Sequence, residues 1–177
     1  MKQILLMIAV VVANPVLAVK PLTKGECAKF IEVAIRKHLK KPTGELTKAD
    51  YEKVKFLSLR GYFLTNVTGL EKLTQLERLS LHNNKLTDLK GLETLTKLET
   101  LDVGGNQLTN VKGLEKLTKL KLLFLSASYK LDDLNGLEKL NQLKELYLRN
   151  CPNLTKAQIA ELQKALPKCK IHSNPTK

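Results

Sequence analysis

The residues that most often carry out chemistry in proteins are few in this chain and lie far apart. No two of the three histidines, His38, His82 and His172, have the spacing of a metal-ligand pair. The chain has no GxSxG, HExxH or phosphate-binding loop, and its one Gly-Gly pair lacks the rest of a nucleotide-binding fingerprint. Asp102 is expected on a strand face, with no second carboxylate opposite it for acid–base catalysis. We therefore predict that the protein is not an enzyme and uses no metal or cofactor.

The chain is organised instead by a repeat that runs from Val54 to Gln142. In register the units read VKFLSLRGYFLTNVTGLEKLTQ, LERLSLHNNKLTDLKGLETLTK, LETLDVGGNQLTNVKGLEKLTK and LKLLFLSASYKLDDLNGLEKLNQ. The first three units have 22 residues (54–75, 76–97 and 98–119), and the fourth (120–142) has 23. Leucine or valine occupies the first, fourth, sixth and eleventh places, a spacing that no helical stripe fits. Self-similarity at a fixed period of this length predicts a solenoid.

Each unit is expected to form one coil that begins with a short strand. Alternate strand residues such as Leu79 and Leu81 point into the coil. Asn84 and Asn106, at the ninth place, can satisfy backbone groups where the chain leaves the strand. Because one coil cannot bury its apolar side alone, the coils must stack, and their strands align as a parallel sheet. Recurring glycines mark the tight turns of the return path: Gly69, Gly91, Gly113 and Gly136.

The pattern L-x-x-L-x-L-x-x-N-x-L followed by GLxxL resembles the leucine-rich repeat, in the short subclass found in phosphatase regulators and bacterial internalins. The stretch AIRKHLKKPTGELTKADYEKVKFLSL resembles the N-terminal caps of internalin-like proteins, and LTKAQIAELQKALPKCKI is similar to C-terminal caps of leucine-rich repeat proteins. The resemblance implies an α/β repeat fold. It would be a right-handed, curved solenoid with a parallel concave β-sheet and helical caps at its N- and C-terminal ends.

The two caps are also predicted by helical periodicity and capping residues. Residues 19–53 are expected to form the N-terminal cap, with an amphipathic helix over Glu26–Lys40 and a second helix that begins at a Thr47–Asp50 capping box. Residues 54–142 hold the four repeats, and residues 143–171 hold a fifth repeat and the C-terminal cap. In that cap, Thr155 and Gln158 begin a helix, and residues 169–171 add an edge strand. Residues 172–177 are expected to be a disordered tail.

The chain has three cysteines, of which only Cys151 and Cys169 are a plausible pair. The expected register places Cys169 level with Leu146 rather than with Cys151. For this pair the sequence therefore leaves two alternatives: a disulfide, or two buried free thiols.

The first eighteen residues resemble a secretory signal peptide. Lys2 gives a positive start, residues 4–12 are apolar, and Val16-Leu17-Ala18 matches a small-x-small cleavage site. The apolar run is shorter than the roughly 20 residues that span a bilayer. We predict cleavage near Ala18 and a secreted, periplasmic or cell-surface protein. An uncleaved anchor and a buried N-terminal segment are the alternatives, and no nucleic-acid partner is expected.

The chain is strongly basic. It has 30 Lys and Arg against 17 Asp and Glu, a net charge of +13. Such a surface favours anionic partners, among them an envelope polymer or lipid. It is equally compatible with lysines that only keep the solenoid soluble. Lysines are expected at convex and loop positions: Lys72, Lys90, Lys97, Lys112, Lys116 and Lys119.

The residues best suited to binding are expected on the concave sheet. If the fourth and sixth places of a repeat point inward, the third, fifth and seventh point outward. Three of the four arginines fall at these places, together with an apolar trio expected to be exposed. Arginine and aromatic residues are enriched at interface hot spots, whereas cross-strand stacking for stability is the alternative. The predicted partner-binding residues are Phe56, Arg60, Arg78, His82, Asp102, Leu122, Phe124, Tyr147 and Arg149.

We therefore expect an exported, monomeric bacterial protein that recognises an unidentified protein partner through its concave face. Electrostatic adhesion of the lysine-rich surface to an anionic envelope polymer or lipid is the first alternative. A phosphatase-regulator-like scaffold is the second. It rests on fold analogy alone, and the signal peptide disfavours it.

Overall fold

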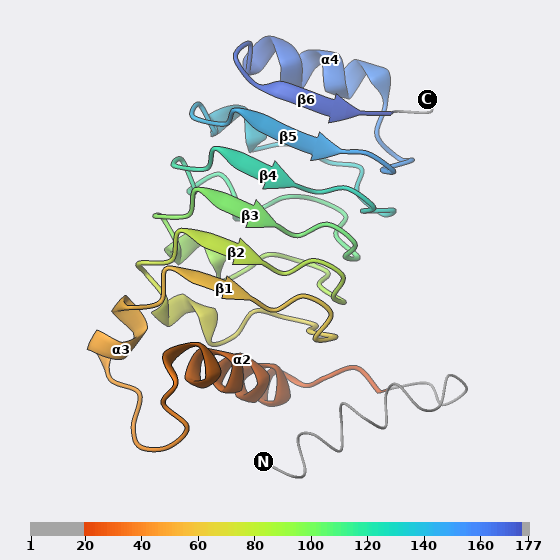
Figure 1. Cartoon of the computed structure of the whole chain (residues 1–177). Helices are drawn as coiled ribbons and strands as arrows, with labels where there is room; N and C mark the ends of the chain where they lie inside the picture. Colours follow the sequence, from red (N-terminus) through yellow and green to blue (C-terminus); the bar gives the residue numbers. More distant parts are fainter. Residues whose placement is uncertain (1–19, 175–177) are drawn as a thin grey trace.

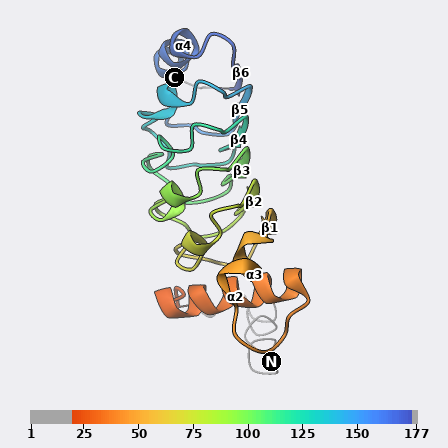
Figure 2. The same ribbon diagram turned by 90° about the vertical axis from the view of Figure 1, so that its left-hand side faces the viewer.

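Six short strands, one from each of the five coils and a sixth from the C-terminal cap, lie side by side in a parallel sheet whose order follows the chain (Figure 1). The computed structural model describes residues 20–174, so the predicted signal peptide lies outside the described residues. The strands are β1 (Phe56–Ser58), β2 (Arg78–Ser80), β3 (Thr100–Asp102), β4 (Leu122–Phe124), β5 (Glu145–Leu148) and β6 (Lys170–Ser173). This sequential parallel pairing confirms the predicted solenoid, and Figure 2 shows the strands along one side of it and the return turns along the other.

The core is a set of leucine rows that run the length of the stack. The strand register places Leu57, Leu79 and Leu101 beside one another, and each is at most 3% exposed. The predicted inward orientation of Leu79 and Leu81 is therefore confirmed. Because every coil adds its leucines to the same rows, each coil covers the apolar side of its neighbour. Full burial of one such side chain contributes about 1.5–3 kcal/mol.

The return path is held by a contact that the repeat supplies in each of the first four coils. Gly91 has a φ of 106°, a left-handed conformation that favours glycine, and a Cβ there would lie 3.4 Å from Val67. Its N–H donates to the carboxylate of Glu93, two residues later, across 2.5 Å. The same bond joins the glycine and the glutamate of the other GLE triplets, at residues 69–71, 113–115 and 136–138. Short 3₁₀ turns follow three of these glycines: η1 (Leu70–Lys72), η2 (Leu92–Thr94) and η3 (Leu137–Lys139).

The predicted role of the ninth-place asparagines is confirmed. Asn84 is buried, accepts a hydrogen bond from the N–H of Leu64 at 3.0 Å, and donates to the carbonyls of Leu59 and Leu81 at 2.9 and 2.8 Å. Asn106 makes the equivalent three bonds one coil further on. Each asparagine thus satisfies backbone groups of two neighbouring coils, which otherwise would be buried without partners.

This asparagine ladder is interrupted in the fourth coil. Ser128 stands at the ninth place and is fully buried, and its hydroxyl oxygen has no hydrogen-bond partner. In the fifth coil, Cys151 takes the place and donates weakly from its Sγ to the carbonyl of Leu125 at 3.4 Å. Burial raises the pKa of this thiol, so it stays protonated and can act as the donor.

Two helices close the N-terminal end of the stack. Helix α2 (Lys24–Leu39) begins at a Thr23–Glu26 capping box and buries Cys27, Ile31 and Ile35 against the first coil. It starts two residues before the predicted boundary, because the cap is Thr23. Helix α3 (Lys48–Glu52) has the predicted Thr47–Asp50 capping box. Hydrogen bonds from Lys41 and Thr47 hold the pKa of the Asp50 carboxyl far below its usual range.

Helix α4 (Lys156–Ala165), followed by strand β6, closes the other end. It has the predicted Thr155–Gln158 capping box. Two sequence expectations need correction here. The tail was expected to be disordered from residue 172, but His172 and Ser173 belong to β6, which pairs with β5. The register is also two residues away from the expected one, because Ile171 rather than Cys169 lies level with Leu146. Cys27, Cys151 and Cys169 are buried free thiols.

Candidate binding face

The outward side chains of the strands form one continuous surface, which we name the sheet face. It consists of the third, fifth and seventh places of each coil, which alternate with the buried leucines. All nine predicted binding residues lie at these places. They differ in exposure, because Phe56 is 43% exposed and the arginines are exposed, whereas the remaining five are half-buried. The half-buried five are His82, Asp102, Leu122, Phe124 and Tyr147.

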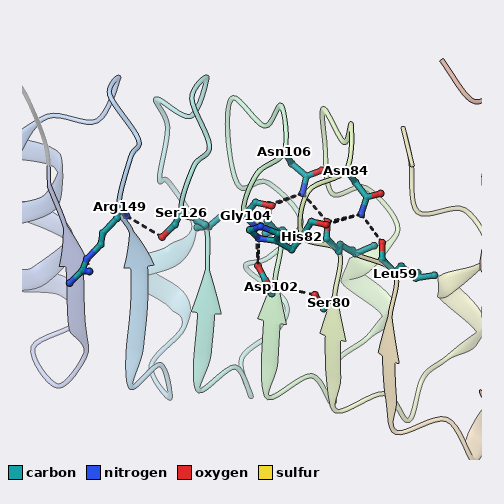
Figure 3. A network of polar contacts seen from close by, with 12 residues as sticks. Leu59, Ser80, His82, Asn84, Asp102, Gly104, Asn106, Ser126 and Arg149 are labelled. Carbon is teal, nitrogen blue, oxygen red and sulfur yellow. Dashed lines mark hydrogen bonds and ion pairs between the residues drawn. The ribbon is translucent and has the colours of Figure 1, made fainter. Parts of the chain in front are cut away.

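A hydrogen-bonded cluster centred on Asp102 occupies the middle of the sheet face (Figure 3). Its Oδ1 lies 3.3 Å from Nδ1 of His82 and accepts from the N–H of Gly104 at 3.2 Å. Its Oδ2 accepts from the hydroxyl of Ser80 at 3.5 Å. The close fit depends on Gly104, because a Cβ there would lie 2.7 Å from the carbonyl oxygen of Ser126. The cluster therefore fixes the His82 ring against the neighbouring strand.

This serine, histidine and aspartate do not form a nucleophilic triad. In a triad the imidazole lies between the other two side chains and takes the proton of the serine. Here the hydroxyl of Ser80 and the ring of His82 are both directed at the carboxylate of Asp102 (Figure 3). The geometry is that of a surface cluster that orients a histidine, and it does not activate Ser80.

Three rings stack across the last three strands. The Phe124 and Tyr147 centroids are 4.7 Å apart with an interplanar angle of 18°, and those of Tyr147 and His172 are 4.3 Å apart at 8°. The register explains this, because Phe124 is paired with Tyr147 and Tyr147 with His172. Leu122 lies on the same face, beside Glu145. The apolar trio expected to be exposed is thus together in space but half-buried.

Glu145 ties two of these rings to the sheet. Its carboxylate accepts from the hydroxyl of Tyr147 at 2.7 Å and lies 3.3 Å from Nε2 of His172. The Tyr147 bond, and then the His172 bond, lower the pKa of the Glu145 carboxyl, and the same carboxylate raises the pKa of the Tyr147 hydroxyl. The rings and the carboxylate of this end are therefore internally satisfied, as the stacking alternative expects, whereas Arg149 of the same coil is exposed.

Sequence reasoning missed both Glu145 and His172 as members of this cluster. His172 was assigned to the tail because the last strand was placed two residues too early. Period-two alternation could not have indicated the correct register, because Cys169 and Ile171 share one face of the strand and a shift of two residues leaves every side chain on its face.

The other end of the sheet face is open. The guanidinium carbon of Arg78 lies 5.6 Å from the ring centroid of Phe56, and His38 of helix α2 meets the same ring edge-on at 6.5 Å. Arg60 follows on the same coil as Phe56. Among residues 20–174, no ion pair involves Arg60, Arg78 or Arg149. Here the structure leaves cationic and aromatic groups available to another molecule.

The repeat that builds this face matches a known protein family. A family model described as leucine rich repeats (2 copies) matches residues 52–94 and again residues 96–139. These coils are leucine-rich repeats. The buried leucine rows, the asparagine ladder and the single parallel sheet are the structural counterparts of that match.

Solved structures of bacterial leucine-rich repeat proteins have the same architecture. An internalin, InlF of Listeria monocytogenes, is 28% identical with a TM-score of 0.75, over 90% of this chain and 47% of its own. A leucine-rich repeat protein of Leptospira interrogans is 28% identical with a TM-score of 0.58, over 72% of this chain and 33% of its own. The chain thus spans less than half of either protein. The functional domain of InlJ from Listeria monocytogenes, 22% identical with a TM-score of 0.56, shares the fold over 75% of this chain and 28% of its own. No curated protein matches the chain in sequence.

Within residues 20–174, no group of three or more His, Cys, Asp or Glu side chains is placed to hold a metal ion. None of the helices in this range is long and apolar enough to cross a membrane.

Proposed function

We propose that this leucine-rich repeat chain is a non-catalytic recognition module, exported from a bacterial cell, that binds a protein partner through its sheet face. The observation that carries the proposal is the set of three arginines that this face presents, none of which has an ion-pair partner among residues 20–174. Arginine and aromatic side chains are the groups most enriched at interface hot spots. The similarity to a Listeria internalin supports a bacterial recognition protein, and the predicted signal peptide at residues 1–18 supports export.

The proposal is tested by capture of partners from the envelope fraction of the source cell. The bait is the chain from residue 19 onward, beside a variant with Phe56, Arg60, Arg78 and Arg149 all changed to Ala. These four side chains are exposed and hold little of the fold together. Substitution of the ring stack would instead test stability, because Phe124 and Tyr147 are half-buried. A matched control replaces the exposed Lys90, Lys112 and Lys116 with Ala.

We expect a protein that is captured by the wild-type chain and by the lysine control, but lost from the face variant. Equal capture by all three baits would contradict recognition through the sheet face. Loss from the lysine control, together with release by moderate salt, would favour adhesion to an anionic envelope polymer or lipid. That second function is motivated by the net charge of +13.

Export has its own test. Expression of the full chain in a bacterial host should yield a mature protein whose N-terminal sequence begins just after Ala18. Recovery of the intact chain with Met1 in the cell pellet would contradict it.

A further inference from the structure

The arginine that lies away from the sheet face shows what a structural arginine looks like in this protein. Arg36 on helix α2 donates to the carboxylate of Glu32 from Nε at 2.8 Å and pairs with it from Nη2 at 2.7 Å. Its Nη1 donates to the carbonyl of Gly44 at 2.9 Å and lies 3.4 Å from that of Lys41. The guanidinium is therefore fully used in fastening the loop between α2 and α3.

The three arginines of the sheet face differ from Arg36 in having their donors free. Within residues 20–174, the guanidinium groups of Arg60, Arg78 and Arg149 make no hydrogen bond to another side chain or carbonyl. The Ser126 contact of Arg149 is made by its backbone N–H (Figure 3). The guanidinium carbon of Arg78 lies 5.6 Å from the centroid of the Phe56 ring, a cation–π contact that uses none of its N–H donors in a hydrogen bond. Three exposed guanidinium groups, each with N–H donors that are not used within the described residues, thus lie on the sheet face.

The two carboxylates of the same face, Asp102 and Glu145, pair with other side chains and not with these arginines. Asp102 already accepts from Ser80 and Gly104 and contacts His82. Glu145 accepts from Tyr147 and contacts His172. Because the acids of the face are engaged within it, the positive charge of the arginines is left for an external anion.

The guanidinium fork matches a carboxylate in a bidentate geometry. The strand order also fixes a spacing. Arg78 on β2 and Arg149 beyond β5 are three strands apart, about 14 Å at the usual separation of neighbouring strands. The register also sets them four residues apart along the strand direction, about 13 Å, so their backbones are separated by about 19 Å. Leu122 and Phe124 lie on β4 between them. An apolar patch between two cationic positions suits a protein segment better than a uniformly charged polymer.

We propose that the partner presents a segment with two acidic positions about 19 Å apart, one bound by Arg78 and the other by Arg149, and with an apolar side chain between them. Arg60, at the seventh place of the first coil, adds a third cationic position. In an extended segment the distance between the two acids corresponds to about six residues. The proposal rests on protein recognition by the sheet face and adds the chemistry of what is recognised.

The test uses a phage-displayed library of random dodecapeptides, selected on the wild-type chain at near-physiological salt. The strongest binder is then synthesised, and its Kd is measured for three variants by fluorescence anisotropy. One variant changes Arg60, Arg78 and Arg149 to Lys, which keeps the charge but removes the fork. A second changes the same three to Ala, and the third changes Lys90, Lys112 and Lys116 to Gln. Thermal unfolding of each variant checks that the fold is retained.

We expect selected peptides with paired Asp or Glu residues, an affinity about tenfold weaker for the Arg→Lys variant, and one unchanged within about twofold for the Lys→Gln variant. Peptides without acidic enrichment that still lose binding to the Arg→Ala variant would overturn the acidic segment and leave recognition by the face intact. Equal affinity for the wild-type chain and the Arg→Lys variant would overturn the fork and indicate general attraction to polyanions. Binding that no face substitution changes would overturn the proposed function as well.

Discussion

The two ends of the sheet face have similar residue types, but the aromatic ring is exposed at one end and packed against other rings at the other. At the N-terminal end, Phe56 is exposed and Arg78 lies on its ring with its donors free. At the C-terminal end, Phe124 is stacked on Tyr147, and Glu145 satisfies the Tyr147 hydroxyl. The comparison shows that an aromatic residue at an outward strand position is not by itself a binding site. What distinguishes the two ends is whether neighbouring strands already provide each group with a partner.

In the core the order is reversed: the buried ninth-place side chains are better hydrogen-bonded beneath the open end than beneath the stacked end. Beneath the open end, Asn84 and Asn106 satisfy the backbone of adjacent coils. Beneath the stacked end, Ser128 and Cys151 stand at the same place, and the Ser128 hydroxyl has no partner. The C-terminal coils thus combine a weaker internal ladder with cross-strand ring contacts on the outside, which add stability of about 0.5–1.5 kcal/mol per ring pair.

The largest expected effect compares the asparagine ladder with the place where Ser128 interrupts it. Asn106→Ala should lower the free energy of unfolding by about 2–4 kcal/mol, because buried backbone groups of two coils lose their partners. Ser128→Ala should be neutral or stabilising by about 1 kcal/mol, because it removes a buried hydroxyl without a partner. Urea denaturation of both variants measures the difference. Equal losses would show that the ladder is not interrupted at Ser128.

The next effect compares one phenylalanine from each end of the sheet face. Phe124→Ala should cost about 2 kcal/mol, since it removes a half-buried ring from the stack. Phe56→Ala should cost less than about 1 kcal/mol, because that ring is largely in solvent. Thermal unfolding of the two variants provides the measurement. If Phe56→Ala were the more destabilising, the open end would have to be reclassified as packed structure.

A smaller effect depends on pH and on Glu145. Hydrogen bonds from Tyr147 and His172 hold the pKa of this carboxyl below its ordinary value in the folded chain. A depressed folded pKa contributes stability above the unfolded pKa, and this contribution is lost as the pH falls through the folded value. Glu145→Gln should therefore be less stable than wild type at neutral pH and approach it below about pH 4. Denaturation midpoints at several pH values test this, and a difference independent of pH would contradict it.

The smallest effect concerns the backbone at the eighth place of the coils. This residue has a positive φ in all five coils, and it is Gly61, Asn83, Gly105, Ala127 and Asn150 in turn. Ala127 has a φ of 59°, where alanine lacks both the freedom of glycine and the local hydrogen bonds of asparagine. Ala127→Gly should stabilise the chain by about 0.5–1 kcal/mol. Gly105→Ala serves as the reverse control and should destabilise it. A loss of stability in Ala127→Gly would mean that the methyl contacts outweigh the strain.

Much of the fold could be predicted because it depends on short-range sequence patterns that recur in each repeat. The leucine spacing requires a coil that buries one side, and the asparagine at the ninth place requires backbone groups to bond. Capping boxes such as Thr155–Gln158 depend on residues three positions apart, so they were found directly. The bond from each glycine N–H to the following glutamate is equally local, but it was not anticipated. The recurrence of the GLE triplet was visible, whereas its geometry was not.

The sequence could predict which residues lie on the sheet face, but not which of them are already packed or hydrogen-bonded there. Period-two alternation places Arg60, Arg78 and Phe124 on the outward side, since side chains of a strand alternate between its two faces. It cannot say that Tyr147 lies between two rings, because that contact joins three strands. Nor could it place His172, whose position depends on how the chain returns from helix α4 to the sheet.

The sequence by itself therefore determined a leucine-rich repeat solenoid, its capped ends and the side chains on its outer sheet. These depend on periodicities and on contacts between residues near one another in the chain. Only the tertiary structure decided which of those side chains are satisfied. The register across strands brings His172 to Glu145, 27 residues away, and onto the Tyr147 ring. Within residues 20–174 it leaves the three arginines of the face without an acid. Hydrogen bonds and ring contacts act over a few ångströms, so a small shift of register would change every one of these pairings.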